Sequence, residues 1–203
     1  RNIFSGVLSL NHQLTKKLSY GVQFRQDVQN DFESPFLYSL GFEQQFHNNY
    51  TLSINTSKNF RIPTFNDLYW KPGGNINLKP EESYQFEIGN AIHLKNVSFQ
   101  INGFYIKSSD LIQWIPNQSG VWSPTNTDET RNVGIEFSAN YKTAINNHLI
   151  EINANYSYTD ARDLETDKQL ISVPKNRING LVNYSHKNWS AFYQLLCNDD
   201  VQF

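Results

Sequence analysis

Apolar and polar residues alternate along most of this chain of 203 residues. The clearest window spans residues 150–158, where every second position is apolar: Ile150, Ile152, Ala154, Tyr156 and Tyr158. Successive side chains of a β-strand point to opposite faces, so this period of two predicts a strand with one apolar and one polar face. About ten windows show the same period and none shows a helical stripe, which predicts an all-β chain.

The connections between these predicted strands alternate strictly between short and long. The short ones fall at residues 16–17, 47–49, 95–96, 145–147 and 186–187, and the long ones near residues 28–34, 59–83, 110–130 and 160–173. In an antiparallel up-and-down meander, this alternation places every short turn at one end of the sheet and every long loop at the other.

The polar face of the predicted strands carries mainly Ser, Thr, Asn, Gln, Gly and Glu. These residues are costly in a dry core without partners, whereas a wide, water-containing lumen accommodates them. Aromatic residues lie toward both ends of the apolar face, as at membrane interfaces, and many windows reach the roughly ten residues of a spanning strand. We therefore predict an all-β, antiparallel, up-and-down transmembrane β-barrel, of which residues 1–203 supply about ten strands of a larger barrel. A soluble β-sandwich or a lipocalin-like barrel is the alternative.

Composition narrows the function classes. The net charge is −2 and Lys and Arg form no run, so we predict no nucleic-acid partner. No apolar run approaches the roughly 18 residues of a membrane-spanning helix. Cys197 is the only cysteine, which excludes an intrachain disulfide. The chain has no methionine and starts with Arg1, so we expect an internal piece of a longer precursor.

The sequence offers no catalytic constellation. The five histidines fall beside predicted short turns and lack the spacings of metal or hydrolase motifs, so we predict no enzyme and no cofactor. Four carboxylates share the last long loop: Asp160, Asp163, Glu165 and Asp167. Oxygen ligands of this kind suit Ca²⁺, but the spacing of an EF-hand is missing and nearby basic residues offset the charge. A solvated loop is therefore the favoured interpretation, with calcium as the alternative.

Aromatic and amide side chains are concentrated in the two longest predicted loops. Flat amphipathic rings beside amides bind bulky polar ligands through stacking and hydrogen bonds. We therefore predict five ligand-binding residues: Trp70, Asn75, Trp114, Asn117 and Trp122. Loop packing or contact with lipid headgroups is the alternative role. We also expect three arginines on the lumen face: Arg25, Arg131 and Arg177. Packing against the barrel wall or a plug domain is their favoured role, and contact with an anionic ligand is the alternative.

Residues 59–90 read NFRIPTFNDLYWKPGGNINLKPEESYQFEIGN, residues 132–141 read NVGIEFSANY, and residues 171–184 read ISVPKNRINGLVNY. These three ordered segments resemble the barrel of TonB-dependent outer-membrane receptors. Ile76 departs from the pattern, because many members have proline after Asn75. By this resemblance, the motif residues with a structural role are Phe60, Arg61, Pro63, Leu68, Tyr69, Pro80, Glu81, Glu87 and Gly89.

The resemblance implies a barrel of about 22 strands in the outer membrane of a Gram-negative bacterium. It also implies active import of a scarce nutrient, such as a ferric siderophore, haem or cobalamin, so the transported ligand can itself contain a metal. The implied partners are membrane lipid and lipopolysaccharide, an N-terminal plug domain, TonB through a segment absent from this sequence, and a surface lipoprotein. A passive porin or diffusion channel and a soluble carbohydrate-binding β domain are the alternatives.

Overall fold

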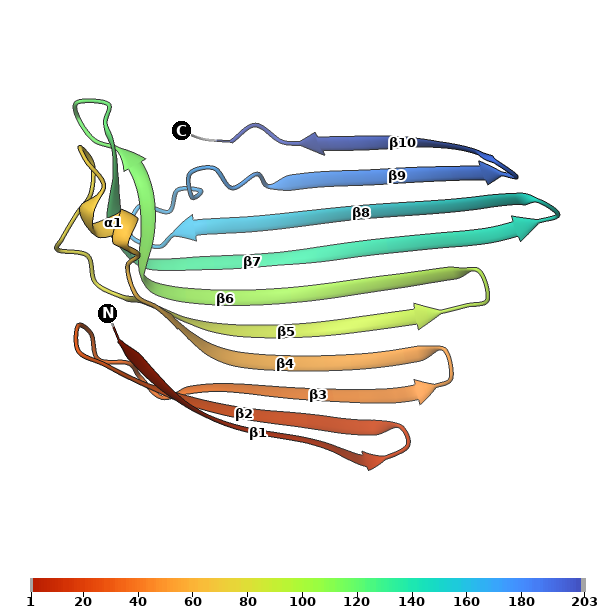
Figure 1. The fold of residues 1–203 in the computed structure, drawn as a ribbon, viewed down its shortest axis with the longest axis horizontal. Helices are drawn as coiled ribbons and strands as arrows, with labels where there is room; N and C mark the ends of the chain where they lie inside the picture. Colours follow the sequence, from red (N-terminus) through yellow and green to blue (C-terminus); the bar gives the residue numbers. More distant parts are fainter. Residues whose placement is uncertain (1, 202–203) are drawn as a thin grey trace.

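The computed structural model describes residues 2–201 and forms one continuous sheet of ten antiparallel strands in chain order (Figure 1). The strands are β1 (Ile3–Thr15), β2 (Leu18–Gln29), β3 (Leu37–His47), β4 (Tyr50–Arg61), β5 (Glu81–His93), β6 (Val97–Pro116), β7 (Trp122–Ile145), β8 (His148–Asp163), β9 (Asn176–His186) and β10 (Trp189–Asn198). One short helix, α1 (Phe65–Tyr69), lies between β4 and β5. The predicted all-β meander is thereby confirmed.

The short turns all lie at one end of the sheet and the longer connections at the other (Figure 1). Asn146 and Lys187 adopt positive φ angles of 55° and 50° in two of the short turns. Such left-handed residues let a tight turn match the twist of its two strands. Neighbouring hairpins are also tied together here, because Gln45 N donates to Lys17 O at 2.7 Å and His93 N donates to Asn49 O at 2.8 Å.

The register places apolar side chains of successive strands opposite one another on a single face. One such row runs through Tyr20, Phe42, Ile54, Ile88, Gly103, Ile135 and Tyr158. The residues one position along these strands face the other way and include Asn55 and Glu87. The sheet therefore has one apolar and one polar face, as the period of two predicts.

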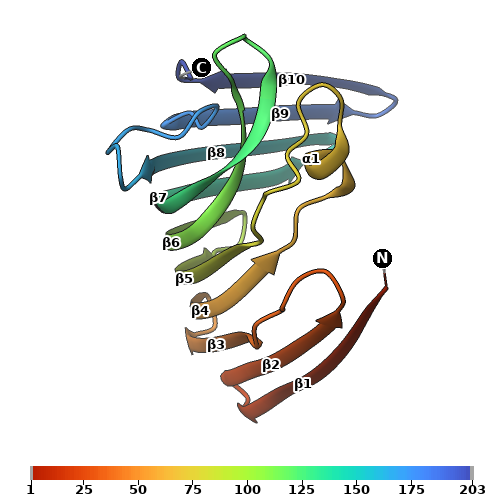
Figure 2. The same cartoon turned by 90° about the vertical axis from the view of Figure 1, so that its left-hand side faces the viewer.

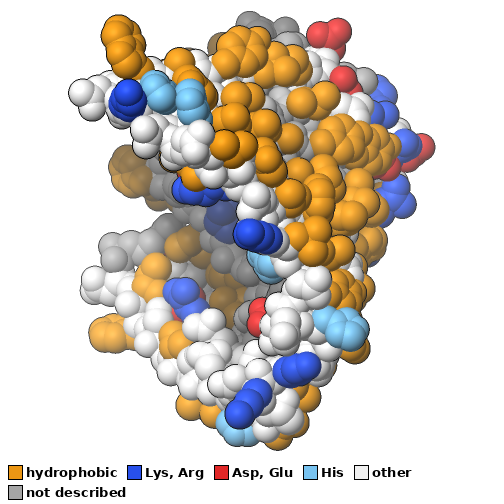
Figure 3. All heavy atoms as spheres, turned by 90° about the vertical axis from the view of Figure 1, so that its right-hand side faces the viewer, with side chains coloured by type: hydrophobic (Ala, Val, Ile, Leu, Met, Phe, Trp, Pro, Cys, Tyr) orange, Lys and Arg blue, Asp and Glu red, His pale blue; other side chains and the backbone are white. Residues whose placement is uncertain are grey.

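The sheet is curved around a hollow on its concave side (Figure 2). Its apolar side chains gather on the convex side (Figure 3). No second sheet covers the apolar face within residues 2–201, and Ile88 and Ile135 remain 40% and 46% exposed. A contiguous apolar surface of this kind marks contact with a membrane or a partner. The β-sandwich alternative is therefore wrong. No helix in the described part of the chain has the length and hydropathy needed to cross a membrane.

Two expected long loops differ from prediction. β6 and β7 continue past the sheet in constant register, from Leu111↔Thr127 to Pro116↔Trp122, so residues 110–130 form a hairpin extension instead of an irregular loop. The connection between β4 and β5 contains α1. Both segments lie at the long-loop end on the concave side of the sheet (Figure 2).

Candidate functional site

The connection between β4 and β5 and the β6–β7 hairpin extension pack against each other. We call residues 61–81 and 110–128 together the loop unit. Its buried apolar cluster consists of Leu68, Leu78 and Ile112, which come from both segments. Ile112 lies on the same face of β6 as the lumen-facing residues, so the cluster holds α1 against the concave side.

An ion pair fixes the base of the loop unit. Arg61 donates from Nε and Nη2 to the two carboxylate oxygens of Glu81, each at 2.8 Å. Glu81 also accepts a hydrogen bond from the backbone N of Ile112 at 3.0 Å, and Arg61 donates to the Ile112 carbonyl at 3.3 Å. A bidentate arginine–carboxylate pair is geometrically specific. It joins the ends of β4 and β5 to the extension of β6. A structural role for Arg61 and Glu81 in the family motif stays a prediction.

Asp67 is the central polar group of the loop unit and is only 5% exposed. It forms a capping box with Thr64, whose backbone N and hydroxyl both donate to Asp67 Oδ2 at 2.8 Å. The indole Nε1 of Trp114 donates to Oδ1 at 2.9 Å, and Arg61 lies 3.9 Å away. Burial acts to raise the pKa of Asp67, but these hydrogen bonds and the Arg61 charge outweigh it and lower the pKa below its ordinary value. Asp67 is therefore held as a carboxylate.

Gly73 and Gly74 lie where neighbouring atoms leave no room for a side chain. A Cβ atom on Gly73 would clash with the carbonyl oxygen of Trp122 and lie 2.9 Å from the ring of Trp70. A Cβ atom on Gly74 would lie 2.7–2.8 Å from backbone atoms of Leu68 and Trp70. Neither glycine has a positive φ angle, so close approach is the reason for glycine at both positions.

Hydrogen bonds join the two segments of the loop unit along their length. The Ser123 hydroxyl donates to the Gly73 carbonyl at 2.6 Å, and the Asn75 amide donates to the Pro124 carbonyl at 3.2 Å. Asn126 accepts from the backbone N of Lys79 at 2.9 Å and donates to the Lys79 carbonyl at 3.0 Å. These bonds connect residues 47–50 positions apart in sequence, so the two segments form one body.

The structure brings all five predicted ligand residues into this body, and it uses several of their polar groups internally. Asn75 braces Pro124 and caps its own turn by accepting from Asn77 N at 3.0 Å. Asn117 lies at the tip of the hairpin and accepts from the backbone N of Ser119 and Val121 at 2.9 and 3.0 Å. The indole of Trp114 donates to Asp67 and its ring meets Trp70 edge-on at 5.5 Å.

Trp70 and Trp122 remain 41% exposed and flank Gly73. Part of each side chain is therefore accessible to a ligand. Ligand contact by all five residues stays a prediction.

The remaining motif residues have various surroundings. Pro63 and Leu68 are buried in the loop unit, whereas Tyr69 is exposed and its ring contacts Phe65 at 4.8 Å. Phe60 and Pro80 flank the Arg61–Glu81 pair in sequence. Glu87 and Gly89 lie on the concave face of β5, where a Cβ atom on Gly89 would lie 2.5 Å from Ser53 Oγ. Sequence reasoning missed Asp67, although Thr64-x-x-Asp67 is a readable capping signal.

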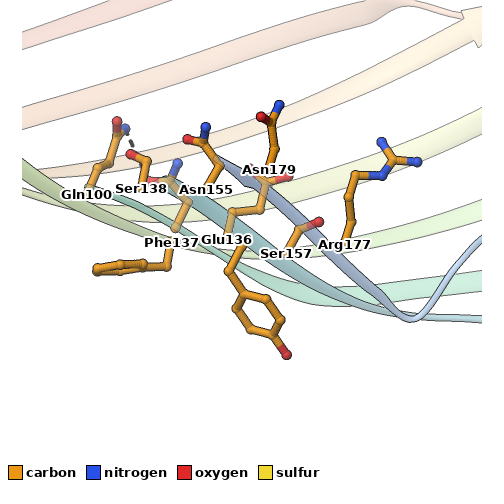
Figure 4. A pocket seen from close by; sticks show the side chains of 10 residues that line it. Gln100, Glu136, Phe137, Ser138, Asn155, Ser157, Arg177 and Asn179 are labelled. Atoms are coloured by element: carbon orange, nitrogen blue, oxygen red, sulfur yellow. Dashed lines mark hydrogen bonds between the residues drawn. The ribbon is translucent and has the colours of Figure 1, made fainter. Parts of the chain in front are cut away.

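The concave wall carries a polar hollow of about 400 Å³ over β6 to β9. Gln100, Ser138, Asn155, Asn179 and Arg177 point into it, and Phe137 points away (Figure 4). Glu136 adds a carboxylate to this lining. Amide groups that both donate and accept, next to one charge of each sign, suit a polar partner in the lumen.

One predicted lumen residue faces the opposite way. Arg25 and Arg177 line concave hollows as expected, but Arg131 shares the face of Val133 and lies opposite Lys107 and Arg162 in register. Arg131 is an odd-numbered residue of β7, and odd-numbered residues of this strand form the apolar face. The prediction that Arg131 faces the lumen is therefore wrong.

The calcium alternative gains no support from the geometry. Arg162 pairs with Asp160 at 3.0 Å and with Asp167 at 2.9 Å. Asp163 instead accepts from the backbone N of Glu165 and Thr166. Within residues 2–201, no three carboxylate, histidine or cysteine side chains gather into a group that could hold a metal ion.

The chain is similar to one known protein family and to individual proteins. Residues 4–202 match the family model described as TonB dependent receptor-like, beta-barrel. The chain is 39% identical over 158 residues to the vitamin B12 transporter BtuB of Photobacterium profundum, covering 74% of this chain and 25% of that protein. It is 35% identical over 131 residues to BtuB of Vibrio vulnificus, covering 64% of this chain and 21% of that protein.

Among solved structures, the siderophore receptor PirA from Acinetobacter baumannii superposes with a TM-score of 0.74 at 20% identity, covering 92% of this chain and 31% of that chain. At this identity the likeness concerns the fold alone. The chain spans a quarter or less of the length of the two BtuB relatives.

Proposed function

This chain belongs to the TonB-dependent receptor-like β-barrel family, and from that premise we propose that it forms wall and outer mouth of a receptor that imports a nutrient across the outer membrane. The apolar convex face would contact lipid, and the polar concave face would line the lumen. A plug domain inside the barrel and energy delivered through TonB belong to the same proposal. Family members are transporters and receptors, in keeping with a chain that carries out no covalent chemistry.

We propose cobalamin as the ligand. The observation that carries this choice is the 39% identity to a protein named vitamin B12 transporter, over 74% of this chain. Ferric siderophores and haem are the competing ligands. We rank them below cobalamin, since the siderophore receptor PirA is only 20% identical to this chain. A passive channel would have the same kind of β-barrel wall, but it would not match the TonB-dependent receptor-like family.

The loop unit supplies the recognition surface in this proposal. Trp70 and Trp122 are each 41% exposed, and the ring of Trp70 and the backbone carbonyl of Trp122 both lie next to Gly73. Their aromatic rings would stack on a flat macrocycle. The amides and Arg177 of the concave hollow then offer hydrogen bonds to polar groups that enter the lumen. Because the two segments of the loop unit are hydrogen-bonded together, any closure over the ligand moves them as one body.

The test uses the full-length receptor in outer-membrane vesicles, with cyanocobalamin and a ferric siderophore as probes. We expect cyanocobalamin to bind and the siderophore not to bind. Trp70→Ala and Trp122→Ala should each weaken binding by about three- to tenfold, because each removes a stacking face. Trp189→Ala is the matched control, since Trp189 is 80% exposed but lies at the short-turn end. Siderophore binding without cyanocobalamin binding would overturn the choice of ligand.

Uptake separates active import from passive diffusion. In cells that lack TonB, the receptor should still bind cyanocobalamin at the surface but should no longer accumulate it. Accumulation at the same rate with and without TonB would favour the passive channel.

A further inference from the structure

The loop unit contains three cationic side chains, Arg61, Lys71 and Lys79, and two of them are engaged inside the protein. Arg61 pairs with Glu81 at 2.8 Å, and Lys79 pairs with Asp110 at 3.4 Å. The ammonium group of Lys71 has no ion pair or hydrogen bond to any residue that the structure describes, and its side chain is exposed. Lys71 can therefore bind an anion without first breaking a contact inside the protein.

Lys71 belongs to a turn that is held beside the two exposed tryptophans. The backbone N of Gly74 donates to the carbonyl oxygen of Trp70 at 2.5 Å, which closes a turn through Lys71. Gly73 is the buried residue of this turn and lies next to the ring of Trp70 and the backbone carbonyl of Trp122, whereas Lys71 is exposed. The packing of Gly73 thus fixes the backbone that carries the free ammonium group close to both tryptophans.

An unpaired ammonium group next to aromatic rings suits a ligand that combines a flat body with an anionic group. The rings supply stacking area, and lysine supplies a compact charge with N–H donors that phosphate oxygens accept. An exposed ion pair alone is weak. Stacking would hold the anion close to the ammonium group, so the second contact forms within the complex at a high effective concentration.

We propose that Lys71 binds the phosphodiester of cobalamin and thereby favours the complete molecule over corrinoids that lack the phosphate. This inference rests on the proposed function, which names cobalamin as the ligand. In this arrangement the corrin ring stacks on Trp70 and Trp122, and the phosphodiester that joins the nucleotide to the ring accepts hydrogen bonds from Lys71. Lys71 then determines specificity, because it contributes only to the binding of ligands that carry the phosphate.

The test compares two probes that differ by one phosphate group, dicyanocobinamide and dicyanocobinamide phosphate, with cyanocobalamin as the third. Binding is measured on the full-length receptor in outer-membrane vesicles. We expect the native receptor to bind dicyanocobinamide phosphate about five- to tenfold more tightly than dicyanocobinamide. Lys71→Gln should abolish this preference and weaken cyanocobalamin binding by a similar factor, while the affinity for dicyanocobinamide should not change.

Further variants separate the charge at position 71 from other effects. Lys71→Glu should reverse the preference, because a carboxylate repels the phosphate. Lys95→Gln is the matched control, since it removes another exposed lysine, in the short turn between β5 and β6, and should keep the preference. Trp70→Ala should weaken binding of all three probes, because they share the corrin ring. Added salt should reduce the phosphate preference of the native receptor, since exposed charges are screened.

The outcomes distinguish this inference from the proposed function. If the native receptor binds the two cobinamides equally, or if Lys71→Gln keeps the preference, Lys71 is a solvated surface lysine. Equal weakening of all three probes by Lys71→Gln would indicate that Lys71 only shapes the turn, and loss of the preference in Lys95→Gln would reflect total charge. Folding of each variant is verified from the heat-modifiable mobility of the barrel. If the folded native receptor binds none of the three corrinoids, the choice of cobalamin is wrong and the role of Lys71 is wrong with it.

Discussion

Replacing Asp67 with alanine tests whether the loop unit is one cooperative body. The substitution removes the acceptor of three hydrogen bonds, from the backbone N and hydroxyl of Thr64 and from the indole of Trp114. It also removes the negative charge beside Arg61, at 3.9 Å. Because Asp67 is 5% exposed, water cannot readily replace these contacts.

The size of the effect follows from these contacts. A hydrogen bond to a charged acceptor contributes about 1.5–3 kcal/mol, and loss of a helix N-cap interaction costs about 1 kcal/mol. The bonds share one carboxylate and are not additive, so we expect a local destabilisation of about 3–4 kcal/mol. Since each 1.4 kcal/mol is a factor of about ten, local opening should rise about 100- to 1000-fold.

Hydrogen exchange of the full-length receptor measures this opening. Amides of residues 62–80 should exchange faster, including that of Asn75, which donates to the Asp67 carbonyl at 2.8 Å. Amides of residues 122–126 should accelerate as well, because Ser123 and Pro124 are bonded to the other segment. Asp163→Ala is the control, since Asp163 caps a turn in the β8–β9 connection and should affect only that loop. Unchanged exchange in residues 122–126 of Asp67→Ala would refute the single-body interpretation.

Three further predictions follow from the same geometry. Gly74→Ala should accelerate exchange throughout the loop unit while leaving the thermal unfolding of the barrel unchanged, because its Cβ would meet backbone atoms of Trp70 at 2.7–2.8 Å. Ile152→Arg should reduce the folded, heat-modifiable fraction, because an arginine on the lipid face destabilises the barrel by about 2–4 kcal/mol. Asn153→Arg, on the lumen face, should leave that fraction unchanged. Equal folded fractions of the two variants would contradict the assignment of faces. The pKa of Asp67 is lowered in the folded state, so the Asp67 carboxylate stabilises the loop unit above the unfolded pKa of about 3.9. This stabilisation is lost as the pH falls below that value. Exchange in residues 62–80, corrected for its intrinsic pH dependence, should therefore accelerate below about pH 4 in the native protein and not in Asp67→Ala.

The wall was predictable because its side chains obey one local rule. Strand windows such as residues 150–158 show the period of two, and the register confirms that their apolar sets share a face. The same rule assigns Arg131 to the convex face with Val133, against the prediction that it faces the lumen. A charged residue at the rim of a membrane face is compatible with that face, because its head reaches the headgroup region.

The loop unit was less predictable, because its structure depends on contacts between distant segments. Beyond Asp110 the alternation breaks, since Ile112 and Trp114 pack against α1 instead of facing water or lipid. Asn75 and Asn117 resemble free ligand-binding amides in sequence, yet their side chains satisfy backbone groups nearby. Asparagine does this readily, and sequence alone does not reveal which backbone groups lack a partner.

The bracing of the loop unit also bears on affinity. A ligand that stacks on Trp70 and Trp122 does not have to order their backbone, because Gly73, Ser123 and the Asp67 network already hold it. Binding to a preorganised site avoids the ordering cost that a mobile loop imposes. Apparent affinity scales with the fraction of molecules in the competent state, so Asp67→Ala weakens binding only if opening becomes the major state. If exchange in Asp67→Ala accelerates about 100-fold while the cyanocobalamin affinity is unchanged, the loop unit of the variant is still mostly closed, so its opening free energy exceeds the contribution of Asp67. If exchange accelerates and the affinity falls together, Asp67 supplies most of the opening free energy of the loop unit.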